Sequence, residues 1–222
     1  MSVTHVRQHN SMLAAAEKRT LIWIAERLPR WINSDHLSAL GLTAMAGAGA
    51  SFVLAGTDPV AGAILVVLCL LLNWFGDSLD GTVARVRDQQ RPRYGYYVDH
   101  VIDLAGTALL FAGLAMSGYM SVTIATLVVA AFFLVSAETY LATHARGVFK
   151  MAFIGVGPTE LRILLAAGAL ALINTPIVDP FGMGPVRLWD LGGVIGAIGM
   201  AMTFVITSTQ NVRALYVEET RR

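Results

Sequence analysis

The chain has 222 residues, of which 55% are hydrophobic and only 14% are charged, and its mean hydropathy is +0.62. Soluble globular domains typically carry about 25% charged residues, so this composition predicts a membrane protein and argues against an ordinary soluble domain. The net charge of +1 provides no basic field that would indicate a nucleic-acid partner. With Cys69 as the single cysteine, a disulfide within the chain and a Cys/His zinc cluster are excluded.

The N-terminal segment is polar and then amphipathic. Residues 1–20 lack an apolar core of the required length, so we expect no signal peptide. Residues 11–28 combine apolar side chains, such as Leu21 and Trp23, with charged ones, and Pro29 follows them. This pattern predicts an amphipathic interfacial helix lying on the membrane. An ordinary helix packed against the rest of the protein is the alternative.

Six apolar segments follow, each close to the roughly 20 residues that a membrane span requires. They cover residues 36–56, 59–82, 95–117, 121–143, 159–176 and 188–212. The stretch 174–185 is rich in proline and glycine and is typical of a longer loop. The sequence therefore predicts an all-α integral membrane protein with six transmembrane helices and an N-terminal interfacial helix, forming a single membrane domain over residues 1–222.

The basic residues are distributed asymmetrically across these six spans. Of the 16 Lys and Arg residues, only Arg187 falls on one side, and the other 15 fall on the opposite side. Because cytoplasmic loops carry an excess of Lys and Arg, we expect both termini to be cytoplasmic, in a multi-pass protein of the cell (inner, cytoplasmic) membrane.

Four aspartates lie near the cytoplasmic ends of the second and third spans. Asp77 and Asp80 are three residues apart, and Asp99 and Asp103 are four apart, so each pair shares one helix face. The two spans are adjacent and antiparallel, which lets the pairs face each other. Carboxylates at this depth are costly unless a cation neutralises them, and an all-oxygen set suits Mg²⁺, Mn²⁺ or Ca²⁺. Ion pairs with the arginines between the spans are the alternative, and this alternative describes Asp88 best.

Small and basic residues accompany these aspartates. Gly81 and Ala84 remove bulk beside the carboxylates, and Arg85 lies on the same helical side as Gly81, where it can pair with a phosphate. Gly95 comes one turn before Asp99. We therefore expect a metal ion that bridges protein carboxylates and a substrate diphosphate, as in metal-assisted phosphoryl transfer.

The stretch from Asp77 to Asp103 resembles the signature of the CDP-alcohol phosphotransferase (CDP-alcohol phosphatidyltransferase) family, D-x2-D-G-x2-A-R-x8/9-G-x3-D-x3-D. All eight fixed positions match: Asp77, Asp80, Gly81, Ala84, Arg85, Gly95, Asp99 and Asp103. The predicted architecture is similar too, with the signature running across spans two and three. Family members often begin the first span with Pro-Asn-x-x-Thr, and this chain departs from that element with Ser34-Asp35-His36-Leu37-Ser38, then Gly41.

The resemblance implies an enzyme of phospholipid synthesis in which an alcohol attacks the β-phosphate of a CDP-linked substrate and CMP leaves. By motif position, Asp77, Asp80 and Asp99 would hold Mg²⁺ or Mn²⁺, and Asp103 would be a further ligand or the catalytic base. Together with Asp77 and Asp80, the CDP pocket would be formed by Gly81, Ala84, Arg85 and Gly95. The chemistry of the residues agrees, because a metal ion offsets diphosphate charge and a carboxylate accepts the alcohol proton.

Several residues are candidates for recognising the acceptor alcohol, and they favour two different kinds of acceptor. His100 directly follows Asp99, as in choline and ethanolamine phosphotransferases, where this histidine is a candidate base for diacylglycerol. Glu138 and Tyr140 are weakly similar to a Trp-Glu-x-Tyr element of that subfamily, and Glu160 closes a Gly-Pro-x-Glu element.

Basic residues near the cytoplasmic face favour a phosphorylated water-soluble acceptor instead. These residues are Arg146, Lys150, Arg162 and Arg213. Ordinary positive-inside placement is the structural alternative for each of them. Two pairs of substrates therefore stay open: CDP-diacylglycerol with a small alcohol, and CDP-choline or CDP-ethanolamine with diacylglycerol.

Assembly and alternative functions can also be considered from the sequence. Gly192-x3-Gly196 permits close helix contacts, and the family tends to form homodimers; packing within one subunit is the alternative. The same aspartates could serve a divalent-cation transporter, but the acidic cluster sits at one end of the membrane and the other spans offer few polar residues. A non-catalytic membrane scaffold is the third class.

Overall fold

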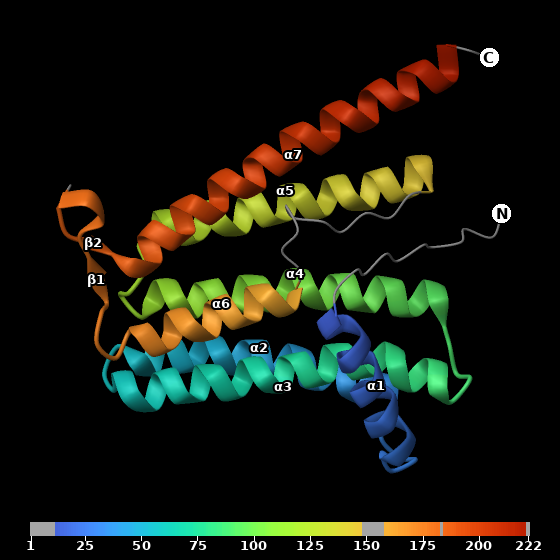
Figure 1. The fold of residues 1–222 in the computed structure, drawn as a ribbon, viewed down its shortest axis with the longest axis horizontal. Helices are drawn as coiled ribbons and strands as arrows, with labels where there is room; N and C mark the ends of the chain where they lie inside the picture. The colour runs from blue at the N-terminus through green and yellow to red at the C-terminus, as the bar shows by residue number, and fades with distance from the viewer. Residues whose placement is uncertain (1–11, 148–157, 183, 221–222) are drawn as a thin grey trace.

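The computed structural model describes residues 12–147, 158–182 and 184–220, and this part of the chain forms seven α-helices (Figure 1). Their bounds are α1 Met12–Arg27, α2 Ser34–Ala55, α3 Pro59–Val86, α4 Pro92–Met116, α5 Val122–Arg146, α6 Pro158–Ala171 and α7 Leu188–Thr220. Five of them, α2, α3, α4, α5 and α7, are long and apolar enough to cross a membrane. The protein is therefore an all-α, multi-pass membrane protein.

Helix α6 is shorter than the sequence analysis expected for the fifth span. Its 14 residues give a length of about 21 Å, which falls short of a hydrocarbon core of about 30 Å. It ends at Ala171, five residues before the expected end, and its last turn is tightened by a bond from Leu172 N to Ala169 O. Pro176 follows and offers no backbone donor to continue a helix. Among the described residues, five candidate spans are thus found in place of the expected six.

The predicted loop between the last two helices contains a small ordered element. Strand β1, Ile177–Val178, pairs antiparallel with β2, Val186–Arg187, and a 3₁₀ turn, Pro180–Gly182, lies between them. Sequence periodicity cannot identify strands of two residues, so this ribbon was not foreseen.

Local chemistry explains where several helices begin and end. Asn33 caps α2: its side chain accepts a hydrogen bond from the backbone N–H of His36, whose ring accepts one from the backbone N–H of Asn33. Asp58 caps α3, and Ser121 caps α5. At its other end, α5 stops at Gly147, whose φ of 66° is the left-handed conformation common after helices.

Helices α2, α3 and α4 form the closely packed part of the molecule (Figure 1). Gly49 of α2 and Gly113 of α4 bring their backbones together, because a side-chain carbon on Gly113 would overlap the backbone of Gly49. Gly76 of α3 approaches the backbone of α2 at Leu37 and Gly41 in the same way. Small residues of this kind permit close helix contact within membranes.

Helix α1 runs across the ends of α2 and α3 rather than alongside them (Figure 1). Its Leu21 and Ala25 are buried with Leu79 and Val83 of α3, whereas Trp23 is 56% exposed. The helix therefore packs on the bundle through one face and exposes an aromatic side chain on another.

Arg87, just after α3, secures the connection between α1 and α2. Its guanidinium donates hydrogen bonds to the carbonyls of Leu28, Pro29 and Ile32. These bonds fix the chain that leads into α2, and thus the start of α2 beside the carboxylates of α3.

Candidate active site

The four aspartates of the signature meet at one cavity between α2, α3 and α4. Asp77 and Asp80 come from α3, and Asp99 and Asp103 from α4, with Ser38 and Gly41 of α2, Asn73 of α3 and Ile102 of α4 completing the lining. The cavity has a volume of about 10 Å³. That is the size of one water molecule or a bare cation, and it is far too small for a nucleotide.

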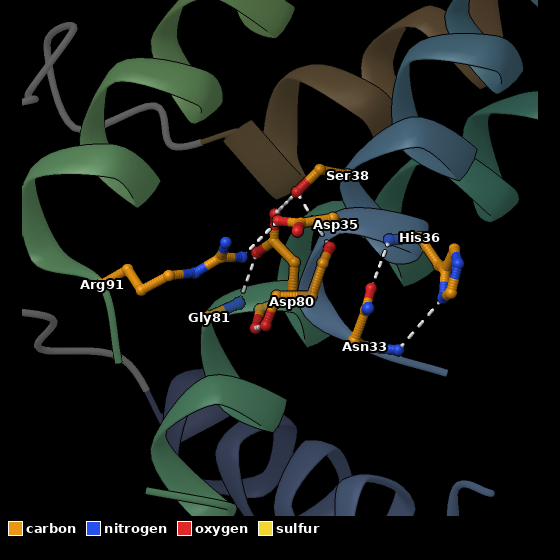
Figure 2. A network of polar contacts seen from close by, with 8 residues as sticks. Asn33, Asp35, His36, Ser38, Asp80, Gly81 and Arg91 are labelled. Atoms are coloured by element: carbon orange, nitrogen blue, oxygen red, sulfur yellow. Dashed lines mark hydrogen bonds and ion pairs between the residues drawn. The ribbon is translucent and has the colours of Figure 1, made fainter. Parts of the chain in front are cut away.

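Asp80 is held by the start of α2 (Figure 2). The Ser38 hydroxyl donates to Asp80 Oδ2 at 2.7 Å, and the backbone N–H of Gly81 donates to Oδ1 at 2.5 Å. Ser34 also donates, to the Asp80 backbone carbonyl at 2.8 Å. The stretch that departs from the Pro-Asn-x-x-Thr element thus still contacts the signature, through Ser34 and Ser38.

A second contact in Figure 2 joins the start of α2 to the segment between α3 and α4. Arg91 and Asp35 form an ion pair at 2.5 Å, and both side chains are about half exposed. The pair lies beside Ser38 and Asp80, next to the carboxylates.

Asp77 is held by a residue of α6. Arg162 Nη2 donates to Asp77 Oδ2 at 2.5 Å, and Arg162 Nε donates to Asn73 Oδ1 at 2.7 Å. The amide nitrogen of Asn73 donates in turn to the Gly41 carbonyl at 3.1 Å. The sequence indicates Arg162 only as a residue for the acceptor, and it does not indicate Asn73, whose one sign is a polar amide one helical turn before Asp77.

His100 lies behind Asp99. It is 6% exposed, and its Nδ1 is 3.2 Å from Asp99 Oδ2. Its ring stacks on Tyr140 of α5 with centroids 4.8 Å apart, and it meets Tyr96 edge-on at 4.1 Å. The residues that line the aspartate cavity do not include His100, although ligand atoms of Asp99, His100 and Asp103 lie within 4.8 Å of one another.

Of the residues expected to form the CDP pocket, Asp77 and Asp80 line this small cavity, and the other four do not. Gly81 and Ala84 are partly buried, and Arg85 is exposed with its Nη2 donating to Thr82 Oγ1 at 3.0 Å. Gly95 is exposed, and a side-chain carbon placed there would meet no atom within 4 Å. The start of α4 at Gly95, one helical turn before Asp99, is therefore open.

The residues expected to bind the acceptor alcohol take part in different contacts in the structure. Glu138 accepts a hydrogen bond from Asn211 of α7 at 2.5 Å, and Asn211 also accepts one from Arg146. Glu138 is thus engaged in the contact between α5 and α7. Glu160 lies exposed in the first turn of α6, and Arg213 is exposed on α7. Lys150 lies outside the described residues.

An apolar groove runs between α3 and α6 next to the site. It has a volume of about 260 Å³, and its lining includes Leu70 and Trp74 of α3 and Ile163 and Ala166 of α6. Arg162 lines it too, so the guanidinium that contacts Asp77 also borders the groove.

The donor set of the cavity fits a hard divalent cation. Four carboxylates and the Ser38 hydroxyl offer oxygen atoms, which are the ligands that Mg²⁺ and Mn²⁺ prefer. Asn73 lines the cavity too, but its Oδ1 accepts a hydrogen bond from Arg162. The imidazole of His100 lies outside the lining.

Comparison with solved structures shows where this fold occurs. The chain is similar to Mycobacterium tuberculosis phosphatidylinositol phosphate synthase (PgsA1) with CDP-DAG bound, with a TM-score of 0.59 and 23% identity over 88% of this chain and 92% of that one. The apo form of the same enzyme gives a TM-score of 0.57 and 21% identity over 90% and 94% of the two chains. At these identities the likeness establishes the fold. No curated protein gives a significant sequence match.

A family model decides the wider assignment. The model of the CDP-alcohol phosphatidyltransferases matches residues 35–206, which is well over half of the chain and includes every aspartate of the cavity. Enzymes of this family use a divalent metal and a CDP-linked donor. The chain therefore belongs to the CDP-alcohol phosphatidyltransferase family, and it is a membrane transferase of phospholipid synthesis rather than a cation transporter or a scaffold.

Proposed function

We propose that the protein transfers a substituted phosphate from a CDP-linked donor to an alcohol and releases CMP, using Mg²⁺ or Mn²⁺ held by Asp77, Asp80 and Asp99. The observation that supports this proposal is the convergence of these three aspartates and Asp103 on a single cavity the size of a bare cation. The metal ion, when bound, supplies positive charge that offsets the charge of the diphosphate and of departing CMP.

The side chains have separable roles in this proposal. Asp103 accepts the proton of the attacking alcohol, or serves as a further ligand. Gly81 and Gly95 leave room for the nucleotide beside the carboxylates. Arg85 lies exposed nearby, where its guanidinium can pair with a donor phosphate.

For the donor, we favour CDP-diacylglycerol. The apolar groove between α3 and α6 borders Arg162, which contacts Asp77, so an acyl chain in the groove would belong to a lipid whose head reaches the carboxylates. The related structure from Mycobacterium tuberculosis has CDP-DAG bound. The acceptor is then a small water-soluble alcohol, and Arg162 with Lys150 and Arg213 is a candidate set for its recognition.

A second pair of substrates, CDP-choline or CDP-ethanolamine with diacylglycerol, is favoured by one observation. Tyr140, from the element that resembles the choline and ethanolamine subfamily, stacks on His100. In this version His100 would meet the diacylglycerol hydroxyl, and Glu138 and Glu160 would belong to the acceptor side.

The membrane arrangement completes the proposal. We infer a single domain over residues 1–222 with α6 as part of a sixth span, the termini and the aspartates on the cytoplasmic side of the cell membrane, and α1 in the interface. Exposed Trp23 supports the interfacial position. A homodimer is consistent with Gly192 and Gly196 of α7, where a side-chain carbon would meet no described atom within 4 Å.

The test is CMP release by the purified protein. One arm supplies CDP-diacylglycerol with a panel of small alcohols and alcohol phosphates, and the other supplies CDP-choline or CDP-ethanolamine with diacylglycerol. We expect metal-dependent release in the first arm. Release only in the second arm would reverse the assignment of the donor.

The aspartates are tested in the same assay. Asp77→Asn, Asp80→Asn and Asp99→Asn should each abolish CMP release, because each removes a charged ligand, while the protein stays folded in detergent. Retention of more than about a tenth of the activity, a barrier change under ~1.4 kcal/mol, would argue that the residue is not a ligand.

A further inference from the structure

A chain of hydrogen bonds crosses three helices beside the aspartate cavity. It runs from the Gly41 carbonyl on α2 to the Asn73 amide on α3, then to the Arg162 guanidinium on α6, and back to the Asp77 carboxylate on α3. Asn73 lies outside the family signature and is 7% exposed. Its burial and its two partners call for a role that the signature does not supply.

An amide suits this position because it donates and accepts at once. Asn73 Nδ2 donates to the Gly41 carbonyl, so the side chain cannot flip without placing its oxygen against another oxygen. Asn73 Oδ1 is thereby aimed at Arg162, where it accepts from Nε at 2.7 Å. A buried polar group that loses such a partner is costly, so the orientation of the amide is well determined.

The guanidinium transmits this orientation to the carboxylate. Its Nε and Nη2 hydrogens point in the same direction from a rigid plane. With Nε fixed on Asn73, Nη2 is directed at Asp77 Oδ2, which it meets at 2.5 Å. The Arg162 side chain is only 16% exposed and that of Asp77 is 28% exposed, so water competes weakly for the pair.

We propose that Asn73 is a positioning residue of the metal site: through Arg162 it fixes the Asp77 carboxylate in the orientation that binds the cation. This inference rests on the proposed function, in which Asp77 is a metal ligand. Hydrogen-bonded partners of a metal ligand typically change metal affinity by about 10- to 100-fold when they are removed. The competing explanation is that Asn73 only joins α2 to α3 through Gly41.

Mn²⁺ binding to the purified protein distinguishes the positioning role from the purely structural one. The binding is measured without substrate, from the signal of free Mn²⁺ in electron paramagnetic resonance. Asn73→Leu keeps the approximate size of the side chain and removes both hydrogen bonds. We expect it to weaken Mn²⁺ binding by about 10-fold, the low end for such a partner. In an Arg162→Gln background the same change should have little further effect, because the residue through which Asn73 acts is already missing.

Asn73→Asp provides a second variant of the right shape. It retains an acceptor for Arg162 but places an oxygen against the Gly41 carbonyl. We expect Asn73→Asp to bind Mn²⁺ more tightly than Asn73→Leu does, and by a larger factor when Arg162 is present than in the Arg162→Gln background. An equal gain in both backgrounds would mean that the new carboxylate acts on the cation directly, and the positioning role would be overturned. If Asn73→Leu does not fold, Asn73→Asp is compared with the wild type instead. We then expect the loss of Mn²⁺ affinity to be at most threefold.

Controls separate failure of this inference from failure of the proposed function. Ser51→Ala removes a buried hydroxyl of α2 that bonds the Gly47 carbonyl away from the cavity, and it should leave Mn²⁺ affinity unchanged. Asp77→Asn should abolish the tight site. If Asp77→Asn has no effect, the proposed metal site itself is wrong. If Asp77→Asn abolishes binding but Asn73→Leu changes nothing, or weakens binding equally with and without Arg162, only the positioning role is overturned.

Discussion

Asp103 and His100 are rival candidates for the group that accepts the alcohol proton, and their surroundings differ. Asp103 lines the aspartate cavity, whereas His100 is buried against Tyr96 and Tyr140 and does not line it. We expect Asp103→Asn to lower turnover by at least about 100-fold, the low end for loss of a general base. His100→Gln should cost much less. Initial rates of CMP release at saturating metal and substrate measure both.

The comparison requires that both variants fold, which thermal unfolding in detergent verifies. A loss in His100→Gln as large as that in Asp103→Asn would shift the base to the histidine. It would also favour the version of the reaction in which diacylglycerol is the acceptor.

Ser38 provides a prediction about the carboxylate on α3. Its hydroxyl donates to Asp80 Oδ2, and a hydrogen bond to a charged group contributes about 1.5–3 kcal/mol. Ser38→Ala should therefore lower kcat/KM for CMP release by about tenfold or more. Ser38→Thr keeps the hydroxyl and should retain most of the activity. Equal values for the alanine variant and the wild type would show that this bond does not matter for the reaction.

The residues of the site divide into those that the sequence could predict and those that it could not. The four aspartates could be placed together because their spacings put each pair on one face of neighbouring helices. The contacts of Arg162 could not be predicted, since it meets Asp77 across 85 positions of sequence. Nothing in a local pattern indicates that a helix so distant in the chain will reach the carboxylates.

The helices themselves followed largely from apolar length, and their ends from local chemistry that hydropathy does not record. Helix α3 continues to Val86 rather than to residue 82, and α4 begins at Pro92 rather than at residue 95. The extension of α3, residues 83–86, is one further turn that carries Arg85, and the extension of α4 adds Pro92, Arg93 and Tyr94, with the proline in the first turn of the helix. Helix α6 differs in the other direction, because it ends at Ala171, before the predicted end at residue 176. An apolar composition alone does not indicate where a helix stops.

The crossing of α2 and α4 provides a prediction at the level of helices. Gly113→Ala would drive a methyl group into the backbone of Gly49. The helices must then separate, and overpacking of this kind typically costs about 1–3 kcal/mol. We expect a lower midpoint of thermal unfolding in detergent and a loss of CMP release, because α2 and α4 both line the cavity.

Gly199→Ala in α7 is the matched control. A side-chain carbon there meets no described atom within 4 Å, and alanine is the better helix former. This variant should unfold at or slightly above the wild-type temperature. If Gly113→Ala were as stable as Gly199→Ala, the close contact between α2 and α4 would not be required for the fold.

For the whole molecule, the remaining question is which end of the bundle faces the cytoplasm. The turn between α3 and α4 and the β1–β2 ribbon lie at opposite ends of the bundle (Figure 1). The first of these ends carries the aspartates and all four arginines between residues 85 and 93, whereas Arg187 lies in β2 at the other end. The positive-inside rule therefore predicts a cytoplasmic active site.

Single cysteines at the two ends test this orientation in a background in which Cys69 is replaced by alanine. Gln89 lies exposed between α3 and α4, and Ile177 in β1 is 61% exposed. In intact cells, a membrane-impermeant maleimide should label Ile177→Cys and should label Gln89→Cys only after the membrane is permeabilised.

The reverse pattern would place the carboxylates outside the cell, away from a cytoplasmic supply of CDP-linked donors. Labelling of both positions from outside would mean that the helices between them do not cross the membrane an odd number of times. Both variants should retain CMP release, since neither residue lines the aspartate cavity, so the labelling reports on the folded, active protein.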